Sequence, residues 1–229
     1  MTVLYEDNHI IAVNKTCNEI VQGDKTGDTP LSETVKAYIK DKYNKPGEVF
    51  LGVTHRLDRP TSGVVLFART SKALTRLNAM FQSHDQIKKT YWAIVQGAPK
   101  QPEARLENWL VRNEPQNKSY IVESPKSKDK SAKWAALSYR TLARGEHYTL
   151  LEVNLETGRH HQIRCQLAAI GCPVKGDLKY GAKRSNPDGG IYLHARKIEF
   201  IHPVSKQNIC ITAPYPEDSL WQQLAASVQ

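Results

Sequence analysis

The sequence predicts an α+β protein with a mixed, largely antiparallel sheet. Two observations support this class: the predicted strands outnumber the predicted helices, and short turns separate several of the strands. A third observation is the alternation within Tyr148–Leu155, where Leu151, Val153 and Leu155 alternate with polar residues. That pattern is typical of a strand with one buried face.

The first predicted strand is the short apolar run His9–Lys15. A helix is expected to follow it, because Asp28 or Thr29 can act as the N-cap and Pro30 suits a first helical turn. The apolar residues that share one face of this helix are Leu31, Val35, Tyr38 and Ile39.

The central part of the chain alternates between strands and a helix. Gly63–Ala68 is a predicted strand, and Thr70 or Ser71 can open a helix after it. Tyr91–Val95 is a further predicted strand. The apolar stripe of the intervening helix consists of Leu74, Leu77 and Phe81.

From Lys100 to Lys133 the chain is polar, and no helix or strand is predicted there. Within it, Ser124–Lys133 is basic and has the composition of a loop. Two interpretations of the basic run remain open: a solvated loop, or a flexible arm that contacts phosphates.

The C-terminal part is predicted to contain four strands and one helix. The helix is expected over Arg159–Ile170 and is followed by Gly171, which can adopt the left-handed conformation that ends helices. No internal repeat or clear linker divides the chain, so residues 1–229 are expected to form a single domain. The strands are Trp134–Thr141, Tyr148–Leu155, Ile191–Ile201 and Asn208–Ala213.

Composition limits the class of partner. The 229 residues carry a net charge of +9, and a basic protein favours a polyanionic partner, most commonly nucleic acid. No apolar run approaches the roughly 20 residues needed to cross a bilayer, and residues 1–8 do not resemble a signal peptide. We therefore expect a cytoplasmic protein without a membrane partner. The four cysteines form no C-x-x-C pair and are expected to be reduced thiols, mostly buried.

The most unusual window is Thr54–Gly63, which places two arginines, a histidine and one carboxylate before an apolar strand. Arg56 and Asp58 lie on the same side of an extended or turned segment. Cationic neighbours favour the ionised carboxylate, and an ionised, positioned carboxylate can act as a nucleophile or a base. From spacing alone, a structural ion pair in a turn remains an equal alternative.

Two further windows carry polar groups that could act on a ligand. Arg159, His160 and His161 are predicted to open a helix, whose first amide groups attract anions, and Arg164 follows one turn later. Tyr91 stands near the start of its strand, where its ring could stack on a base and its hydroxyl could handle a proton. A basic helix start and a core tyrosine are the alternatives.

Four ordered segments give the sequence a specific resemblance. His55–Ala68 (HRLDRPTSGVVLFA) resembles the signature of the RluA family of pseudouridine synthases. The family pattern continues at residues 89–97 (KTYWAIVQG), 155–181 (LETGRHHQIRCQLAAIGCPVKGDLKYG) and 193–203 (LHARKIEFIHP). Residues 1–15 also resemble the usual entry to the catalytic domain, so the resemblance spans nearly the whole chain.

The resemblance implies the pseudouridine synthase catalytic fold, with a cleft across the sheet, and isomerisation of uridine in rRNA or tRNA without cofactor or metal. It places the family's catalytic aspartate at Asp58, its active-site tyrosine at Tyr91 and its active-site arginine at Arg164. Further residues expected to contact RNA or the flipped base are His55, Arg56, Arg59, Arg159, His160 and Leu193. A monomer is expected.

The sequence also departs from the family pattern. Thr16–Ile20 replaces the usual Pro-x-Gly turn, His160 replaces a threonine, and Cys165 and Gln166 replace Val-His. None of these is Asp58 or Tyr91, so the departures affect substrate recognition more than catalysis. Many relatives carry an N-terminal S4-type RNA-binding domain, whereas this chain resembles the short members that lack one.

Two other functions remain as alternatives. A metal-independent RNA phosphodiesterase could use histidines such as His160 and His161 as acid and base, but it leaves Asp58 unexplained and predicts strand cleavage. A non-catalytic RNA-binding or ribosome-assembly factor could share the fold, although a decayed enzyme would be free to lose Asp58, Tyr91 and Arg164. No cysteine and histidine spacing indicates a metal site.

Overall fold

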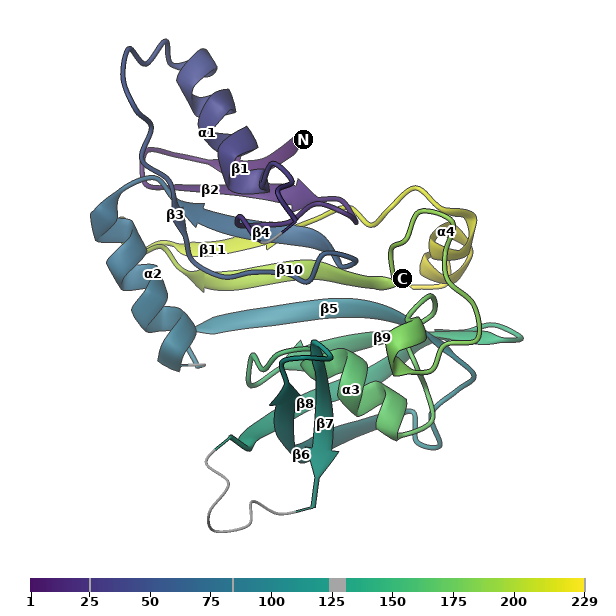
Figure 1. The fold of residues 1–229 in the computed structure, drawn as a ribbon. Helices are drawn as coiled ribbons and strands as arrows, with labels where there is room; N and C mark the ends of the chain where they lie inside the picture. Colours follow the sequence, from purple (N-terminus) through teal and green to yellow (C-terminus); the bar gives the residue numbers. More distant parts are fainter. Residues whose placement is uncertain (25, 84, 124–130, 229) are drawn as a thin grey trace.

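The computed structural model describes residues 1–229 except 25, 84, 124–130 and 229, and its strands form one continuous sheet (Figure 1). Within this described part, the sheet contains eleven strands. They are β1 (Thr2–Glu6), β2 (Ile10–Lys15), β3 (Gly52–Val53), β4 (Ser62–Ala68), β5 (Ile87–Gln96), β6 (Glu103–Asn113), β7 (Lys118–Val122), β8 (Lys133–Arg144), β9 (Tyr148–Leu155), β10 (Leu193–Ile201) and β11 (Asn208–Thr212).

The strand order confirms a mixed, largely antiparallel sheet. The main path is β1-β2-β4-β10-β5-β9-β8-β6-β7, while β11 pairs with β10 and β3 pairs with β4. Strands β4 and β10 run parallel, and the other strand pairs of the described chain are antiparallel. This parallel pair lies in the middle of the sheet, directly after the loop that carries Asp58.

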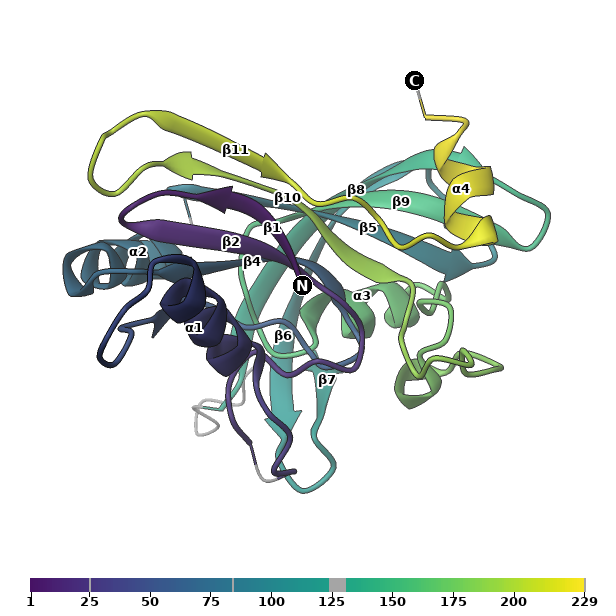
Figure 2. The same ribbon diagram turned by 90° about the horizontal axis from the view of Figure 1, so that it is seen from above.

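The helices lie on both faces of the sheet. Figure 2 shows α1, α2 and α3 on one side and α4 on the other. The helices of the described chain are α1 (Leu31–Lys42), α2 (Ser71–Ser83), α3 (Gln162–Ala169), α4 (Ser219–Ala225) and the short 3-10 helix η1 (Leu178–Tyr180).

Alternation along β5 explains how both faces are covered. Ala93 belongs to the buried cluster that contains Ile163 of α3, whereas Ile94 belongs to the cluster that contains Trp221 of α4. Because successive side chains of a strand point to opposite faces, Tyr91 lies on the α3 side with Ala93. The chemistry predicted at Tyr91 therefore belongs to the face that α3 covers.

The loop before β4 is fixed to the core from behind. All seven residues of β4 are buried, and Gly63 adopts φ +117° where β4 approaches β10. A Cβ atom at Gly63 would lie 2.4 Å from the carbonyl oxygen of Ala195, so only glycine allows this approach. The close contact sets where the preceding Asp58 loop meets the sheet.

Two predicted helix starts differ from the structure. The N-cap of α1 is Pro30, with no side-chain cap, because the carboxylate of Asp28 binds Arg59 instead. Helix α3 begins at Gln162 and not at Arg159, because its N-cap His161 adopts the left-handed conformation, φ 52°. The predicted end of this helix is confirmed, since Gly171 has φ +79°.

The polar segment from Lys100 to Lys133 contains two strands that were not predicted. Strands β6 and β7 pair with each other as a hairpin, and β6 also pairs with β8. Most residues of β6 are exposed or half-buried, and its longest apolar run is Trp109–Val111, so the sequence gives only a weak strand signal. The basic run Ser124–Lys133 lies largely outside the described residues.

The cysteines carry free thiols, as expected. Cys165 and Cys172 are buried, Cys17 is partly buried and Cys210 is exposed. The expectation of mostly buried thiols therefore holds for only two of the four. Across the described part of the chain, no helix is long and apolar enough to cross a membrane.

Candidate active site

The Asp58 loop is held by a buried lysine. The ammonium group of Lys15 donates hydrogen bonds to the carbonyl oxygens of Thr16, Arg59 and Thr61, at 2.9, 3.0 and 2.7 Å. Burial lowers the pKa of Lys15 to about 8. Because two of the three carbonyl groups follow Asp58 closely in the chain, these bonds fix the backbone that presents its side chain.

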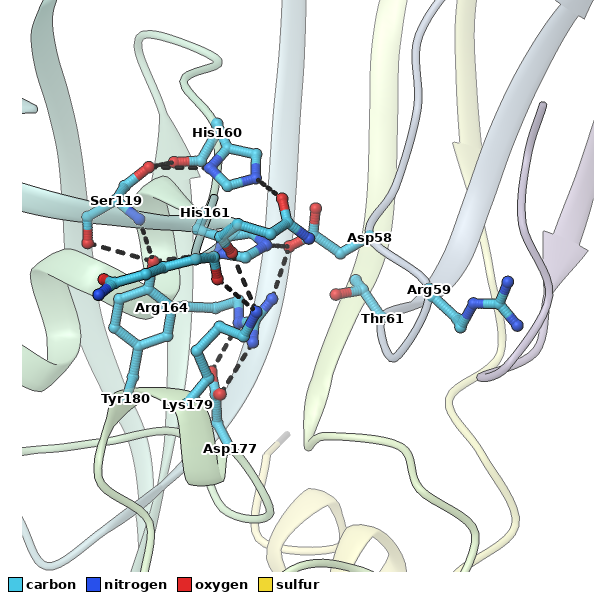
Figure 3. A network of polar contacts seen from close by, with 12 residues as sticks. Asp58, Arg59, Thr61, Ser119, His160, His161, Arg164, Asp177, Lys179 and Tyr180 are labelled. Carbon is cyan, nitrogen blue, oxygen red and sulfur yellow. Dashed lines mark hydrogen bonds and ion pairs between the residues drawn. The ribbon is translucent and has the colours of Figure 1, made fainter. Parts of the chain in front are cut away.

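The carboxylate of Asp58 meets a buried arginine. Arg164 Nη1 lies 3.0 Å from Asp58 Oδ2, and the other edge of the guanidinium group binds Asp177 with Nε–Oδ2 at 2.6 Å and Nη2–Oδ1 at 2.8 Å (Figure 3). The Asp58 side chain is 30% exposed, whereas those of Arg164 and Asp177 are 6% and 1% exposed. Burial opposes the charge of Arg164, but the two carboxylates outweigh it and raise its pKa.

These exposures indicate which residue of the network holds which. A guanidinium group bound at two atoms by a buried carboxylate has a fixed orientation. Asp177 therefore holds Arg164, and Arg164 in turn holds the more accessible Asp58. The cation in contact with Asp58 is therefore Arg164 of α3, and among the described contacts neither Arg56 nor Arg59 binds this carboxylate.

A histidine and a tyrosine complete the network around Asp58. His161 Nε2 lies 3.5 Å from Asp58 Oδ2, and His161 Nδ1 lies 3.0 Å from the hydroxyl of Tyr180. Burial and the neighbouring charge of Arg164 lower the pKa of His161 to about 2, so its imidazole is neutral. The Tyr180 ring lies 5.2 Å from the Arg164 guanidinium carbon and contacts the cation through its π face.

Tyr91 and Leu193 contribute an apolar wall beside Asp58. They lie on the paired strands β5 and β10 and line the same cleft as Asp58. Burial, and next the negative charge of Asp58, raise the pKa of Tyr91, so its phenol keeps its proton at neutral pH. A flat ring beside an aliphatic side chain suits a stacked planar base.

The cleft has a volume of about 410 Å³ and a basic lining. Among its described lining residues, Asp58 is the one carboxylate. The cationic side chains that surround it are Arg56, Lys89, Arg112, Arg159 and Arg164. One carboxylate among five cations suits an anionic ligand that reacts at a single position.

The structure brings eight of the nine predicted site residues to this cleft. They are His55, Arg56, Asp58, Tyr91, Arg159, His160, Arg164 and Leu193. Arg59 is the exception: its guanidinium group points away from Asp58 (Figure 3) and binds Asp28 and Thr26, with Asp24 at 3.7 Å. The turn after Asp58 reverses the direction of the following side chain, whereas Arg56, two residues earlier, stays on the Asp58 side.

Two histidines of the cleft have structural contacts. His55 Nε2 accepts a hydrogen bond from the Leu66 amide at 3.0 Å, and its ring stacks on Phe81. Burial lowers the pKa of His55 to about 3. His160 stacks on His161 with ring centroids 3.8 Å apart, and burial lowers its pKa. Neither group carries a charge at neutral pH.

Asp177, Tyr180 and Lys15 were not assigned from the sequence. Asp177 and Tyr180 lie within the segment 155–181, which ends in GDLKYG. Asp177 and Tyr180 between two glycines were the sequence signal that could have indicated a site, but only the fold shows that both residues contact Arg164. Among the described residues, no group of three potential metal ligands comes together.

Comparison with known proteins gives a consistent family. The model of a family described as RNA pseudouridylate synthase matches residues 9–169. The chain is 34% identical to the ribosomal large subunit pseudouridine synthase D of Xylella fastidiosa over 99% of this chain and 69% of that protein. It is 32% identical to the tRNA pseudouridine synthase C of Vibrio cholerae over 98% of this chain and 94% of that protein.

Solved structures give the same fold. Human RNA pseudouridylate synthase domain containing 4 superimposes with a TM-score of 0.79 over 94% of this chain and 89% of that chain, at 22% sequence identity. Human RNA pseudouridylate synthase domain containing 1 superimposes with a TM-score of 0.68 at 20% identity. At these identities the structural likeness concerns the fold alone.

Proposed function

The chain belongs to the RNA pseudouridylate synthase family, and we propose that Asp58 is the residue through which it isomerises uridine to pseudouridine. The observation that carries this proposal is the position of Asp58 as the one carboxylate among the described lining residues of a basic cleft. Arg164, itself fixed by Asp177, holds Asp58 from one side, while the Asp58 side chain remains 30% exposed to a substrate.

The reaction replaces the N1–C1′ bond of uridine with a C5–C1′ bond, and two routes suit a carboxylate. In one, an Asp58 oxygen bonds to C1′ while N1 leaves with the bonding electrons. After the uracil turns, C5 bonds to C1′ and the carboxylate leaves with its electron pair. Positive charge develops on the ribose when the first bond breaks, as it does in glycosidases.

In the second route, Asp58 removes the C2′ proton as N1 leaves, and a C1′–C2′ double bond forms. When C5 then bonds to C1′, Asp58 returns the proton to C2′. In both routes C5 loses its proton to solvent and N1 gains one. Either route needs a carboxylate held at the sugar, and the contact with Arg164 at 3.0 Å holds the Asp58 side chain in place.

The other cleft residues receive roles that follow from their chemistry. Tyr91 stacks on the uracil, and with Leu193 it forms the apolar wall against which the base lies. Arg56, Lys89 and Arg159 contact phosphates. Extruding a base from a structured RNA costs a few kcal/mol, and these contacts offset that cost.

The substrate class is inferred from the relatives, which are named as a pseudouridine synthase of the large ribosomal subunit and a tRNA pseudouridine synthase. We therefore propose rRNA or tRNA as the substrate of this chain. We further propose that the protein acts in the cytoplasm as a monomer, with residues 1–229 forming a single catalytic domain. A non-catalytic RNA-binding role is not favoured, because the relatives are named as enzymes and the site keeps Asp58 together with Tyr91 and Arg164.

The test is release of tritium from RNA labelled at uridine C5. Total rRNA and tRNA from cells that lack the gene serve as separate substrates for the wild-type protein. Release from one pool, with intact RNA strands, supports the function and identifies the substrate class. Binding without release from either pool would contradict the proposal, and strand cleavage would indicate the phosphodiesterase instead.

A further inference from the structure

A hydrogen bond from Arg164 and a longer polar contact from His161 both reach the same carboxylate oxygen of Asp58. Arg164 Nη1 lies 3.0 Å from Asp58 Oδ2, and His161 Nε2 lies 3.5 Å from this oxygen (Figure 3). Among the described residues, Oδ1 accepts no hydrogen bond. The two oxygens of Asp58 therefore have different environments before any substrate binds.

The contact from His161 depends on which nitrogen carries its proton. Since burial lowers the pKa of His161 to about 2, the imidazole has one N–H donor and one lone-pair acceptor. A lone pair on Nε2 would face the Asp58 carboxylate and be repelled by it. A proton on Nε2 would be attracted to Oδ2, so the carboxylate favours the Nε2–H tautomer.

Tyr180 favours the same tautomer from the opposite side of the ring. Its hydroxyl oxygen accepts a hydrogen bond from the Ser119 amide at 2.8 Å. The hydroxyl proton can then be donated to His161 Nδ1 at 3.0 Å or to the Ser119 carbonyl oxygen at 3.3 Å. The shorter contact is to Nδ1, and donation there leaves Nε2 as the protonated nitrogen.

The backbone of His161 also indicates a residue held for its position. Its φ of 52° is uncommon for a residue other than glycine and is sterically unfavourable. Its side chain is 5% exposed, and His160 stacks on it at 3.8 Å. The ring is therefore fixed between His160, Tyr180 and Asp58 with little freedom to rotate.

We propose that His161 is a positioning residue, kept by Tyr180 as the neutral Nε2–H tautomer, which together with Arg164 occupies Oδ2 of Asp58 and leaves Oδ1 to react. This inference rests on the proposed function of Asp58 and adds which of its oxygens reacts. Ser119 belongs to β7, so the hairpin of β6 and β7 is linked to the catalytic carboxylate through Tyr180 and His161.

The tautomer can be measured without activity. Histidine labelled with ¹⁵N gives distinct two-bond ¹H–¹⁵N patterns for the Nε2–H tautomer, the Nδ1–H tautomer and the imidazolium. The His161 signal is assigned by its loss in His161→Asn, because asparagine tolerates the left-handed backbone. We expect the neutral Nε2–H pattern from pH 5 to pH 8. An Nδ1–H pattern or an imidazolium in this range would overturn the proposal.

The kinetic test uses Tyr180→Phe, which keeps the ring against Arg164 and removes the hydroxyl. Tyr139→Phe is the matched control, because Tyr139 is also buried but donates its hydroxyl to the Gln101 carbonyl oxygen away from the cleft. We expect Tyr180→Phe to lower the single-turnover rate about tenfold, as one lost hydrogen bond predicts, with RNA affinity within about twofold of wild type.

Equal rates for Tyr180→Phe and Tyr139→Phe would overturn the positioning role, as would a loss of RNA affinity without a change in rate. The two arms also separate this inference from the proposed function. If the wild-type protein makes no pseudouridine, the function fails, while the tautomer of His161 is still read directly from the spectrum.

Discussion

Replacing Asp177 with asparagine removes the charge that allows Arg164 to stay buried. The Asp177 side chain is 1% exposed and binds the guanidinium group at 2.6 and 2.8 Å, and the Arg164 side chain is 6% exposed. Breaking a buried ion pair by removing one partner costs about 3–5 kcal/mol, because the other charge is left uncompensated. The amide oxygen of asparagine still accepts one hydrogen bond, which places the expected loss near about 3 kcal/mol.

The measurement is the free energy of unfolding from urea titration, with thermal unfolding alongside. For a chain of this size about 3 kcal/mol corresponds to a decrease in Tm of roughly 6–12 °C. Asp188→Asn is the matched control, since Asp188 is exposed and the asparagine amide oxygen can still accept the hydrogen bond from the Gly190 amide, so stability should change by no more than about 0.5 kcal/mol. Asp58→Asn should also cost less than Asp177→Asn, because Arg164 keeps its buried partner.

Equal stability losses for Asp177→Asn and Asp188→Asn would show that Arg164 does not depend on Asp177 for its burial. The proposed order, in which Asp177 holds Arg164 and Arg164 holds Asp58, would then be wrong. A larger loss for Asp58→Asn than for Asp177→Asn would reverse that order.

Three further predictions follow from particular contacts. Arg56→Ala should weaken RNA binding and reduce its salt dependence by about one counterion, whereas Arg59→Ala should leave both unchanged. The measurement is RNA affinity at several salt concentrations for both variants. Equal slopes of affinity against salt for Arg56→Ala and Arg59→Ala would contradict this prediction. Because the pKa of His55 is lowered to about 3, the unfolded chain binds a proton that the folded chain does not between about pH 6.5 and pH 3, so stability falls as the pH falls. His55→Gln should flatten this slope by up to about 1.4 kcal/mol per pH unit, and an unchanged slope in urea titrations would contradict the assignment. Gly63→Ala should prevent normal folding, because its Cβ would lie 2.4 Å from the Ala195 oxygen and φ is +117°, and a soluble variant with the wild-type circular dichroism spectrum and Tm would contradict this packing.

The sequence was most informative where apolar runs are continuous. The run Gly63–Ala68 was predicted as a strand and is the buried centre of β4, since full burial requires apolar side chains on both faces. Strand β6 was missed for a different reason: its alternation is weak, since Leu110 is its one buried residue and its half-buried positions, such as Ala104 and Asn108, are not consistently apolar.

At the site, residue spacing predicted which side chains lie on the same side as Asp58, but spacing alone did not predict which cation contacts its carboxylate. Arg56 was expected on the Asp58 side and does line the cleft, whereas Arg59 follows a turn and binds Asp28. The contact between Asp58 and Arg164 joins residues 106 positions apart in the chain. Only the pairing of β4 with β10 and the packing of α3 bring such distant groups together, and no local pattern encodes that.

The left-handed backbone of His161 was also beyond local rules. Arg159 and His160 are residues that commonly open a helix, so the sequence predicts a helix that begins at Arg159. The helix starts at Gln162 instead, because the His161 backbone is left-handed while its side chain contacts Tyr180 and Asp58.

The central claim is that Asp58 performs the chemistry while the basic cleft binds the RNA. The direct measurement compares wild type with Asp58→Asn in two assays on one RNA: affinity, and single-turnover release of tritium from uridine C5. Asp58→Asn is expected to bind the RNA with an affinity within a few-fold of wild type and to release no detectable tritium. Release by a variant preparation free of wild-type protein, at more than a trace of the normal rate, would contradict the assignment of Asp58 as the reacting carboxylate.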